Sequence, residues 1–359
     1  MLTLPTYFED FLQCIRPTQK QRQDARDGHK LLRERLTADE VLKALIVTTF
    51  LQGSYRRATA NRPKDESRSD VDVVVVTDID NTKMTPQQAM DLFKPFLEKH
   101  YKGKYTQNDR SFQIELSAVK LDLVITARPD PADLKMLKSA ILLRDDSIDD
   151  LTEFTLSATG DSGWKAHPLL IPDRRLMVWQ PTHPLAQIQW TWDKNKVCNG
   201  HYVNVVKPVK WWRIVRHPTP AYPKGYPLEH LVGQCCPDGV ASVAEGVTRT
   251  LEEIASRYKV DVQNGRVPYL KDHGVDQNVM HRVTAQQFAE FHGQVEQAAK
   301  TARDALDETS RFRATEKWRK LFGEKFPLAE DDTATDDGGA KGGFTPRSEP
   351  SRISGGRYA

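Results

Sequence analysis

One stretch limits what this chain can fold into: an Asp-Val-Asp triplet at residues 70–72 leads directly into four valines at 73–76. β-Branched residues favour a pleated surface, and an unbroken apolar run is typical of a strand covered on both faces. Because side chains alternate along a strand, Asp70 and Asp72 are expected to point to one face, about 7 Å apart along the chain. Two such carboxylates repel each other unless a cation lies between them, so the pattern predicts a metal site.

The segment before this strand predicts a phosphate-binding turn. Gly53 and Ser54 lie between a strand expected over residues 47–51 and a short helix expected over residues 55–60. A glycine lets the backbone approach a phosphate closely. A serine at the start of a helix offers its hydroxyl, and the free backbone N–H groups beside it, to the same anion.

A third carboxylate, Asp122, lies in an apolar stretch over residues 119–126 that again predicts a strand. If this strand pairs with the first, backbones about 4.8 Å apart bring Asp70, Asp72 and Asp122 around two ions roughly 4 Å from each other. Mg²⁺ is the expected ion, because it prefers oxygen ligands and usually shares a few carboxylates with substrate phosphates. This is the geometry of in-line nucleotidyl transfer, so the three aspartates are predicted to be both catalytic residues and metal ligands.

The order of these parts, a Gly-Ser turn, an Asp-x-Asp strand and a lone aspartate on a later strand, resembles the polymerase-β-like nucleotidyltransferase superfamily. Further segments resemble the bacterial cGAS/DncV-like nucleotidyltransferases (CD-NTases) of CBASS anti-phage systems, most of all their clade D. These segments lie at residues 110–114, 183–188, 198–202, 209–213, 226–230 and 321–327. The resemblance extends roughly over residues 1–327 and the extreme C-terminus.

The resemblance implies an α+β fold. In it, a polymerase-β-like nucleotidyltransferase lobe with a mixed sheet is joined to a helical second lobe, and the active site lies in the cleft between them. The expected parts are N-terminal bracing helices at 1–40, the nucleotidyltransferase core lobe at 41–130, a mostly helical second lobe at 131–327 and a disordered C-terminal tail at 328–359. Apolar spacing predicts helices near residues 5–36, 85–101, 195–216, 240–258 and 284–309, with a kink or break at Pro208.

The resemblance also implies a role for each part of the predicted site. Asp70 and Asp72 are expected to hold the Mg²⁺ ion that binds the donor triphosphate. Together with Asp122 they are expected to hold the second ion, beneath the acceptor hydroxyl. Gly53 and Ser54 are the expected ligands of the phosphates.

Three more residues are nucleotide-binding candidates. The resemblance implies that Lys210 contacts the triphosphate; taken by itself, it is as well explained as a lysine that snorkels beside a tryptophan pair. Relatives carry a phosphate-binding serine followed by an aromatic residue that stacks on the donor base. Here Gly225 replaces the serine, so a phosphate contact is expected from the backbone or from Lys224. Tyr226 is the expected base platform, and packing beside Pro227 is the alternative.

The composition argues against several other classes of protein. Hydrophobic residues make up 38% of the 359 residues, and the net charge of only +3 gives no sign of a general nucleic-acid binder. No apolar run approaches the roughly 20 residues that cross a membrane, and the N-terminus shows no signal-peptide pattern. Four cysteines are too few for a disulfide framework, so reduced thiols in a bacterial cytoplasm are expected. A metal site at His230, Cys235 and Cys236 is a weaker alternative.

The predicted function is therefore a cyclic oligonucleotide synthase that makes a second messenger for anti-phage signalling. The resemblance implies a cyclic trinucleotide made mainly from ATP, and leaves a second nucleoside triphosphate open. It also implies a product-sensing effector, and a ubiquitin-conjugation-like or other operon-encoded regulator that acts on the tail through conjugation of Ala359. The alternatives are a template-independent polymerase or tRNA-tailing enzyme, an antibiotic-modifying nucleotidyltransferase, and a catalytically silent nucleotide-binding module.

Overall fold

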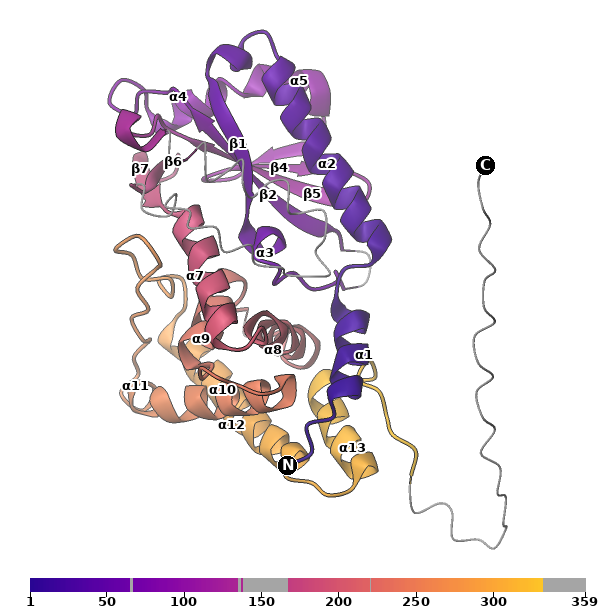
Figure 1. Ribbon diagram of the computed structural model, residues 1–359. Helices are drawn as coiled ribbons and strands as arrows, with labels where there is room; N and C mark the ends of the chain where they lie inside the picture. The colour runs from indigo at the N-terminus through magenta and orange to yellow at the C-terminus, as the bar shows by residue number, and fades with distance from the viewer. Residues whose placement is uncertain (65–66, 135–136, 138–166, 220, 332–359) are drawn as a thin grey trace, which may run out of the picture.

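The computed structural model describes residues 1–64, 67–134, 137, 167–219 and 221–331. These residues form a lobe built on a β-sheet and a lobe built of helices, with the N-terminal helices beside both (Figure 1). Among the helices of these ranges, none is long and apolar enough to cross a membrane. Ala359 and the tail from residue 332 onward lie outside the described residues, so the conjugation and disorder predictions for them are not addressed.

The sheet is mixed and has five strands in the order β1-β2-β5-β4-β3. The strands are β1 (Ile46–Gln52), β2 (Ser69–Thr77), β3 (Tyr105–Gln107), β4 (Phe112–Glu115) and β5 (Val119–Thr126). The two acidic strands, β2 and β5, are neighbours and run parallel, whereas β1 and β4 pair antiparallel with β2 and β5 respectively. The predicted pairing of the two acidic strands is therefore confirmed.

Alternate residues of β2 enter different cores, as the period of two in a strand requires. Val71, Val73 and Val75 pack against the helices on one face, which include α2 (Gln19–Ala38), α4 (Pro86–Asp91) and α5 (Lys94–Tyr101). Val74 and Val76 pack on the opposite face, with Leu169 and Leu185. Asp70 and Asp72 share the parity of Val74 and Val76, so they belong to the face that carries the start of α7 (Pro184–Val197).

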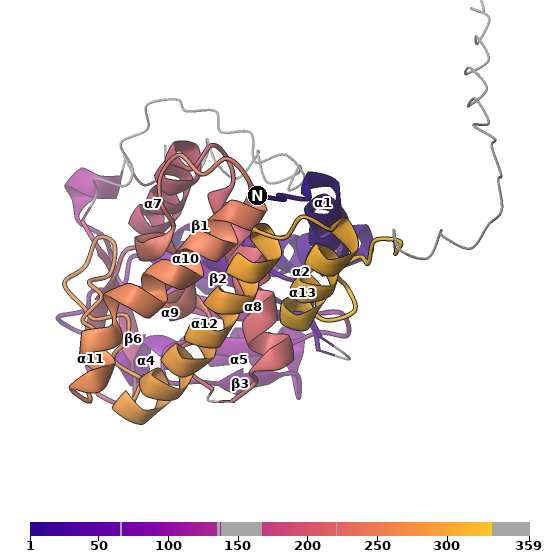
Figure 2. The ribbon, with the colours of Figure 1, turned by 90° about the horizontal axis from the view of Figure 1, so that it is seen from below.

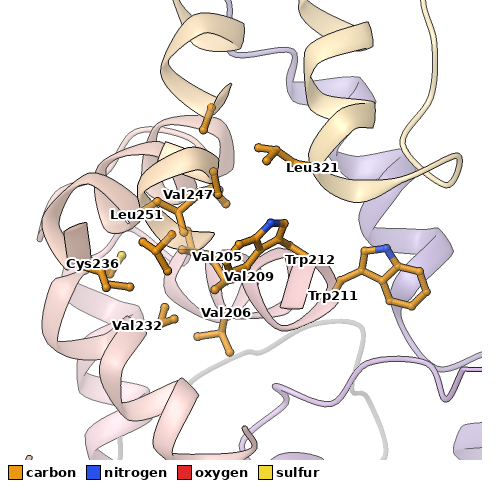
Figure 3. Close-up of a cluster of buried hydrophobic side chains, with 14 of the residues drawn as sticks. Val205, Val206, Val209, Trp211, Trp212, Val232, Cys236, Val247, Leu251 and Leu321 are labelled. Carbon is orange, nitrogen blue, oxygen red and sulfur yellow. The ribbon is translucent and has the colours of Figure 1, made fainter. Parts of the chain in front are cut away.

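The helical lobe is arranged around α8, which is buried on nearly every side. Its helices are α7, α8 (Tyr202–Arg216), α9 (Tyr226–Cys235), α10 (Val243–Arg257), α11 (Lys259–Gln263), α12 (Ala285–Leu306) and α13 (Arg311–Phe322). Figure 3 shows Val205, Val209 and Trp212 of α8 surrounded by apolar side chains of other helices, among them Leu251 and Leu321. In the view from below, α12 lies between α10 and α13 (Figure 2).

The N-terminal helices take part in both cores. Phe8 of α1 (Pro5–Ile15) packs edge-to-face on Trp318 of α13, Phe11 stacks on Phe322 of the same helix, and both phenylalanines lie in the helical core. Leu32 and Leu36 of α2, by contrast, lie in the core of the sheet lobe. The predicted pair of helices over residues 5–36 is present, and each of the two packs on a different lobe.

Several predicted boundaries are wrong. The short helix expected over 55–60 is α3 (Gly53–Arg56), which begins at the glycine itself. The helix expected over 195–216 begins only at Tyr202, and Pro208 lies inside it without ending it. Because α8 is buried on nearly every side, packing outweighs the one hydrogen bond that a proline removes.

Two other parts of the second lobe were not predicted. A hairpin of β6 (Leu169–Asp173) and β7 (Val178–Thr182) lies within the segment expected to be mostly helical, and Leu170 O accepts the backbone N–H of Ala127 just after β5. The expected tail also begins too early. Ala329 is buried, and its backbone N–H donates to Thr315 Oγ1, so the chain is still packed on α13 at that residue.

Candidate active site

The three predicted carboxylates lie on neighbouring strands and on one face of the sheet. Asp72 and Asp122 are direct partners in the parallel pairing of β2 with β5. Residues paired in this way have side chains on the same face, on backbones about 4.8 Å apart. Asp70, two residues before Asp72 on the same strand, completes the group. The structure therefore brings together the triad that the sequence predicts.

The electrostatics of this group are those of like charges held together. Partial burial, together with the charges of Asp72 and Asp70, raises the pKa of Asp122 to about 7. Burial likewise raises the pKa of Asp72 to about 6, against the opposing effect of Arg57. One oxygen of Asp122, Oδ1, is buried and has no hydrogen-bond partner among the described residues. The site is therefore short of positive charge and of donors.

The Gly-Ser turn lies directly against this group. Gly53 has φ of +73°, and a Cβ atom added to it would stand 1.8 Å from Oδ2 of Asp72. Its neighbour Gln52 is the strand partner of Asp72. Only glycine fits a position with both a left-handed backbone and a carboxylate at that distance. Ser54 follows as the second residue of α3.

The oxygen ligands of the triad fit a hard divalent cation. Among the described residues, no group of three or more His, Cys, Asp or Glu side chains is placed so that it could hold a metal ion. Mg²⁺ is seldom bound by protein ligands alone; it uses one or two carboxylates, water and the phosphates of a substrate. The unpartnered oxygen of Asp122 suits such a shared site.

Lys210, the predicted triphosphate ligand, is held inside an ion cluster. Its Nζ donates to Oε1 of Glu229 at 2.7 Å and to the backbone oxygen of Thr59 at 3.0 Å. An ammonium group has three N–H donors, so these two bonds leave one for a ligand. Both of these acceptors are protein oxygen atoms, a contact that the snorkelling alternative does not include.

Tyr226 is anchored at its hydroxyl and covered on its ring. The hydroxyl donates to Oδ1 of Asp272 at 2.6 Å, and the guanidinium carbon of Arg57 lies 5.0 Å from the ring centroid. Lys224 Nζ lies over the ring of Tyr222, 5.2 Å from its centroid. In this arrangement a face of the predicted base platform is already occupied by Arg57, and Lys224 contacts an aromatic ring.

Sequence reasoning missed two charged residues beside the triad. Arg57 and Glu229 form a buried ion pair with 3.1 Å between Nη2 and Oε2, and both side chains are 5% exposed. Glu229 lies 172 residues after Arg57, so no local periodicity reports the contact. The only sequence signal was indirect, since Glu229 lies in the segment 226–230 that carries the family resemblance.

The alternative metal site in the helical lobe gains no support from the neighbours of its residues. Cys236 has Cys198 as its neighbour, with 3.9 Å between the sulfur atoms, and all four cysteines are free thiols. The ring of His230 stacks on that of His273, with centroids 4.3 Å apart. Its two ring nitrogens are buried and have no hydrogen-bond partner among the described residues.

Comparison with known proteins adds a family and several relatives. Residues 2–129 match the model of the Second Messenger Oligonucleotide or Dinucleotide Synthetase (SMODS) domain. The chain is 45% identical to a cyclic AMP-AMP-GMP synthase of Enterobacter hormaechei, with 97% of each chain covered. It is 31% identical to a cyclic AMP-AMP-AMP synthase of Acinetobacter, with 91% of this chain and 86% of that protein covered.

Solved structures share the fold at low sequence identity. The Vibrio cholerae cyclic AMP-GMP synthase DncV, in complex with nonhydrolyzable GTP, matches with a TM-score of 0.63 and 13% identity over 92% of this chain and all of that one (100%). E. coli MS115-1 CdnC, in its complex with HORMA-deltaN, matches with a TM-score of 0.60 and 15% identity over 90% of this chain and 99% of that one.

Proposed function

The chain belongs to the cGAS/DncV-like nucleotidyltransferases, which make cyclic oligonucleotide second messengers, and on this premise we propose that it joins ATP and GTP into a cyclic trinucleotide. Two relatives, 45% and 44% identical over nearly the whole chain, are named as synthases of cyclic AMP-AMP-GMP, the second one as probable. The relative named for cyclic AMP-AMP-AMP is only 31% identical. The gradient of identity favours two adenylates and one guanylate in the product.

The in-register pairing of Asp72 with Asp122, with Asp70 on the same face, carries the proposal of nucleotidyl transfer. Two Mg²⁺ ions bound there would supply charge neutralisation at the triphosphate and lower the pKa of the acceptor hydroxyl. Asp70 and Asp72 would hold the ion at the donor triphosphate, and all three aspartates would hold the ion at the acceptor hydroxyl. Asp122 accepts the proton of that hydroxyl when it attacks.

The remaining predicted ligands orient the leaving group and the base. The backbone at Gly53 and the hydroxyl of Ser54 bind the phosphates beside Asp72. The free N–H of Lys210 supplies one further donor to the phosphates. Tyr226 and Lys224 bind the donor nucleotide, and because Arg57 covers a ring face of Tyr226, the base reaches the platform at the ring edge or at its other face.

One site repeats the reaction until the ring closes. Each attack of a hydroxyl on an α-phosphorus forms one phosphodiester bond and releases one pyrophosphate. Two such steps give a linear trinucleotide that keeps its 5′-triphosphate. In the last step its terminal hydroxyl attacks that triphosphate, and the third pyrophosphate leaves.

The biological setting that we propose is the one that the family resemblance implies. A role in anti-phage signalling in the cytoplasm, with a product-sensing effector, is part of the proposal. Regulation by a partner protein is supported by the solved complex of CdnC with HORMA-deltaN. Conjugation of the tail through Ala359 is the form of regulation we propose for this chain.

The test is a synthesis assay with the purified full-length protein, labelled ATP and GTP, and Mg²⁺. The expected product resists phosphatase, is cleaved by nuclease, and has the mass of a ring of two adenylates and one guanylate. A ladder of products with free phosphate ends would instead identify a template-independent polymerase. Nucleotide binding without turnover would identify a silent binding module.

A further inference from the structure

Glu229 is a buried carboxylate that binds donors from two parts of the chain. It is 4% exposed, and its Oε2 accepts hydrogen bonds from Nε and Nη2 of Arg57 at 3.2 and 3.1 Å and from Oγ1 of Thr59 at 2.8 Å. Its Oε1 accepts from Nζ of Lys210 at 2.7 Å. Burial by itself would raise the pKa of Glu229, but Lys210 and Arg57 lower it below its ordinary value, so the group is ionised.

These donors come from both lobes. Arg57 and Thr59 directly follow α3, which lies at the edge of the sheet that faces the helical lobe (Figure 1). Lys210 belongs to α8 and Glu229 to α9. A single carboxylate therefore ties the segment after the Gly53 turn to the helix that carries Lys210.

The cluster fixes the orientation of Lys210. A lysine side chain is a flexible four-carbon stem with a rotatable ammonium group, and holding it in one geometry costs rotamer entropy. Here Glu229 and the backbone oxygen of Thr59 take two of the three N–H donors of Lys210. The direction of the third is then set by the tetrahedral nitrogen. Without Glu229 the ammonium would keep one anchor and could rotate about it.

Arg57 extends the effect of Glu229 to the triad. Its guanidinium group lowers the pKa of Asp72 and lies over the ring of Tyr226. The same guanidinium is fixed by two hydrogen bonds to one oxygen of Glu229. One carboxylate thus orients a cation beside the aspartates and a second cation on α8.

Stability alone does not explain such a cluster. Replacing a buried ion pair by apolar residues of similar size is often neutral or stabilising, so buried charges are poor evidence for a stabilising role. Counted without Asp72, which lies within electrostatic reach of Arg57, the two cations and one carboxylate of the cluster leave a net charge of +1. A residual positive charge beside a phosphate-binding turn suits a site for an anion.

We propose that Glu229 is a positioning residue for nucleotidyl transfer, which fixes Lys210 and Arg57 relative to the Gly53 turn. It acts through these two cations and does not itself touch the nucleotide. The proposal rests on the proposed function, because it assigns Lys210 to the triphosphate. Its distinguishing consequence is that loss of the Glu229 charge makes the site more positive but less ordered.

The main test is Glu229→Gln, which keeps the shape and removes the charge. We expect kcat per folded molecule to fall about 10- to 100-fold, because a misplacement of about 1 Å has effects of this size. The dissociation constant for a non-hydrolysable ATP analogue with Mg²⁺ is expected to fall about twofold or more, since the net charge rises from +1 to +2. Glu252→Gln is the matched control, because Glu252 pairs with Arg303 in the same lobe at 2.7 Å.

A purely structural role predicts a different result. Glu229→Gln would then lower the stability without tightening analogue binding, and kcat per folded molecule would stay within about twofold of wild type. Either observation, unchanged kcat or unchanged or weaker binding, overturns the proposal. If the wild-type protein makes no cyclic product, the proposed function fails. The dissociation constant of the ATP analogue still decides whether Glu229 acts as proposed.

A milder variant covers the case in which Glu229→Gln does not fold. Thr59→Val removes only the hydroxyl donor to Glu229 and keeps the backbone oxygen that receives Lys210. Thr248→Val is its control, because Thr248 is also fully buried and its hydroxyl donates to Ala244 O within α10. We expect Thr59→Val to lower kcat about fivefold, the equivalent of one hydrogen bond, and Thr248→Val to leave it unchanged. Equal kcat values for the two variants overturn the proposal.

Discussion

The carboxylates of the triad on the sheet and the single carboxylate of Glu229 in the helical lobe have opposite surroundings. The triad gathers like charges, and the pKa of Asp122 is raised to about 7 by burial and by its two acidic neighbours. Glu229 is more deeply buried, yet its pKa is lowered because Lys210 and Arg57 surround it. The triad has an oxygen without a partner, whereas both oxygens of Glu229 accept hydrogen bonds.

The difference separates a site that needs a ligand from one that is complete. A cluster of like charges destabilises the fold until a cation binds, so its presence is explained by what binds there. A carboxylate with its own donors needs nothing from outside, and its effect is on the groups it holds. Substitutions at the two places should therefore affect different quantities. Removing charge from the triad should lower activity and should not lower the free energy of unfolding, whereas removing charge around Glu229 should lower the free energy of unfolding.

The largest effect is expected from Asp70→Asn together with Asp72→Asn. Synthesis of the cyclic product should fall on the order of 1000-fold or more, because several kcal/mol of metal-dependent stabilisation is lost. The free energy of unfolding should stay the same or rise, since two like charges are removed. Product formation and a thermal melt without metal measure the two quantities. Asp78→Asn, which removes an exposed partner of Arg128, is the control. Unchanged synthesis would exclude these residues from the chemistry.

The converse change is Arg57→Met in the Glu229 cluster. Glu229 keeps its pair with Lys210 but loses two charge-assisted hydrogen bonds in a buried site, so the free energy of unfolding should fall by about 3 kcal/mol. Urea unfolding measures this value. Arg303→Met is the control, because it breaks a pair with Glu252 in which both side chains are more than a third exposed (35% and 37%). Such a pair contributes about 1 kcal/mol or less. Equal losses of unfolding free energy in Arg57→Met and Arg303→Met would contradict the expectation that the buried pair contributes more than the exposed one.

A smaller effect is expected from Gly53→Ala, which tests the contact between the turn and the triad. The new Cβ would stand 1.8 Å from Asp72 Oδ2 on a backbone with positive φ, so we expect a loss of about 2 kcal/mol together with most of the activity. Gly103→Ala is a close control: φ there is +69°, and no atom lies within 4 Å of the added Cβ. The difference between the two unfolding free energies isolates the contact with Asp72. Equal losses would show that the contact is not required.

The smallest effect is expected from substitution of Lys207, a buried lysine that lies near other cations, as the aspartates of the triad lie near one another. Burial, then the charges of Arg16 and Lys210, lower the pKa of Lys207 from 10.5 to about 7. Between these values the unfolded chain binds more protons than the folded one, so stability rises with pH across this window. Lys207→Met should therefore be more stable than wild type at pH 6, on the order of 1 kcal/mol, with the difference vanishing near pH 10. Urea unfolding at both pH values measures this, with Lys300→Met, an exposed lysine on α12, as control. A stability difference between Lys207→Met and wild type that is the same at both pH values would contradict the lowered pKa of Lys207.

The catalytic strand and its acidic face follow from local sequence. The alternation of Asp70 and Asp72 with Val71, and the valines that follow, specify a strand and its parity, because the period of two is a property of the backbone. The pairing with the Asp122 strand does not follow from that period; it was the condition for the predicted site, and the structure shows it. The hairpin of β6 and β7 was not predicted, since the segment 127–180, in which most of it lies, carries many prolines and acids without a clear period.

The chain by itself thus determined which chemistry is available: three carboxylates on one face, a glycine that allows close approach, and lysines on an apolar helix. Only the tertiary structure decided which charges meet. Arg57 and Glu229 are separated by 172 residues, and Lys210 reaches Thr59 across 151. Contacts of this range depend on how two lobes pack, and nothing in the spacing of neighbouring residues encodes that packing.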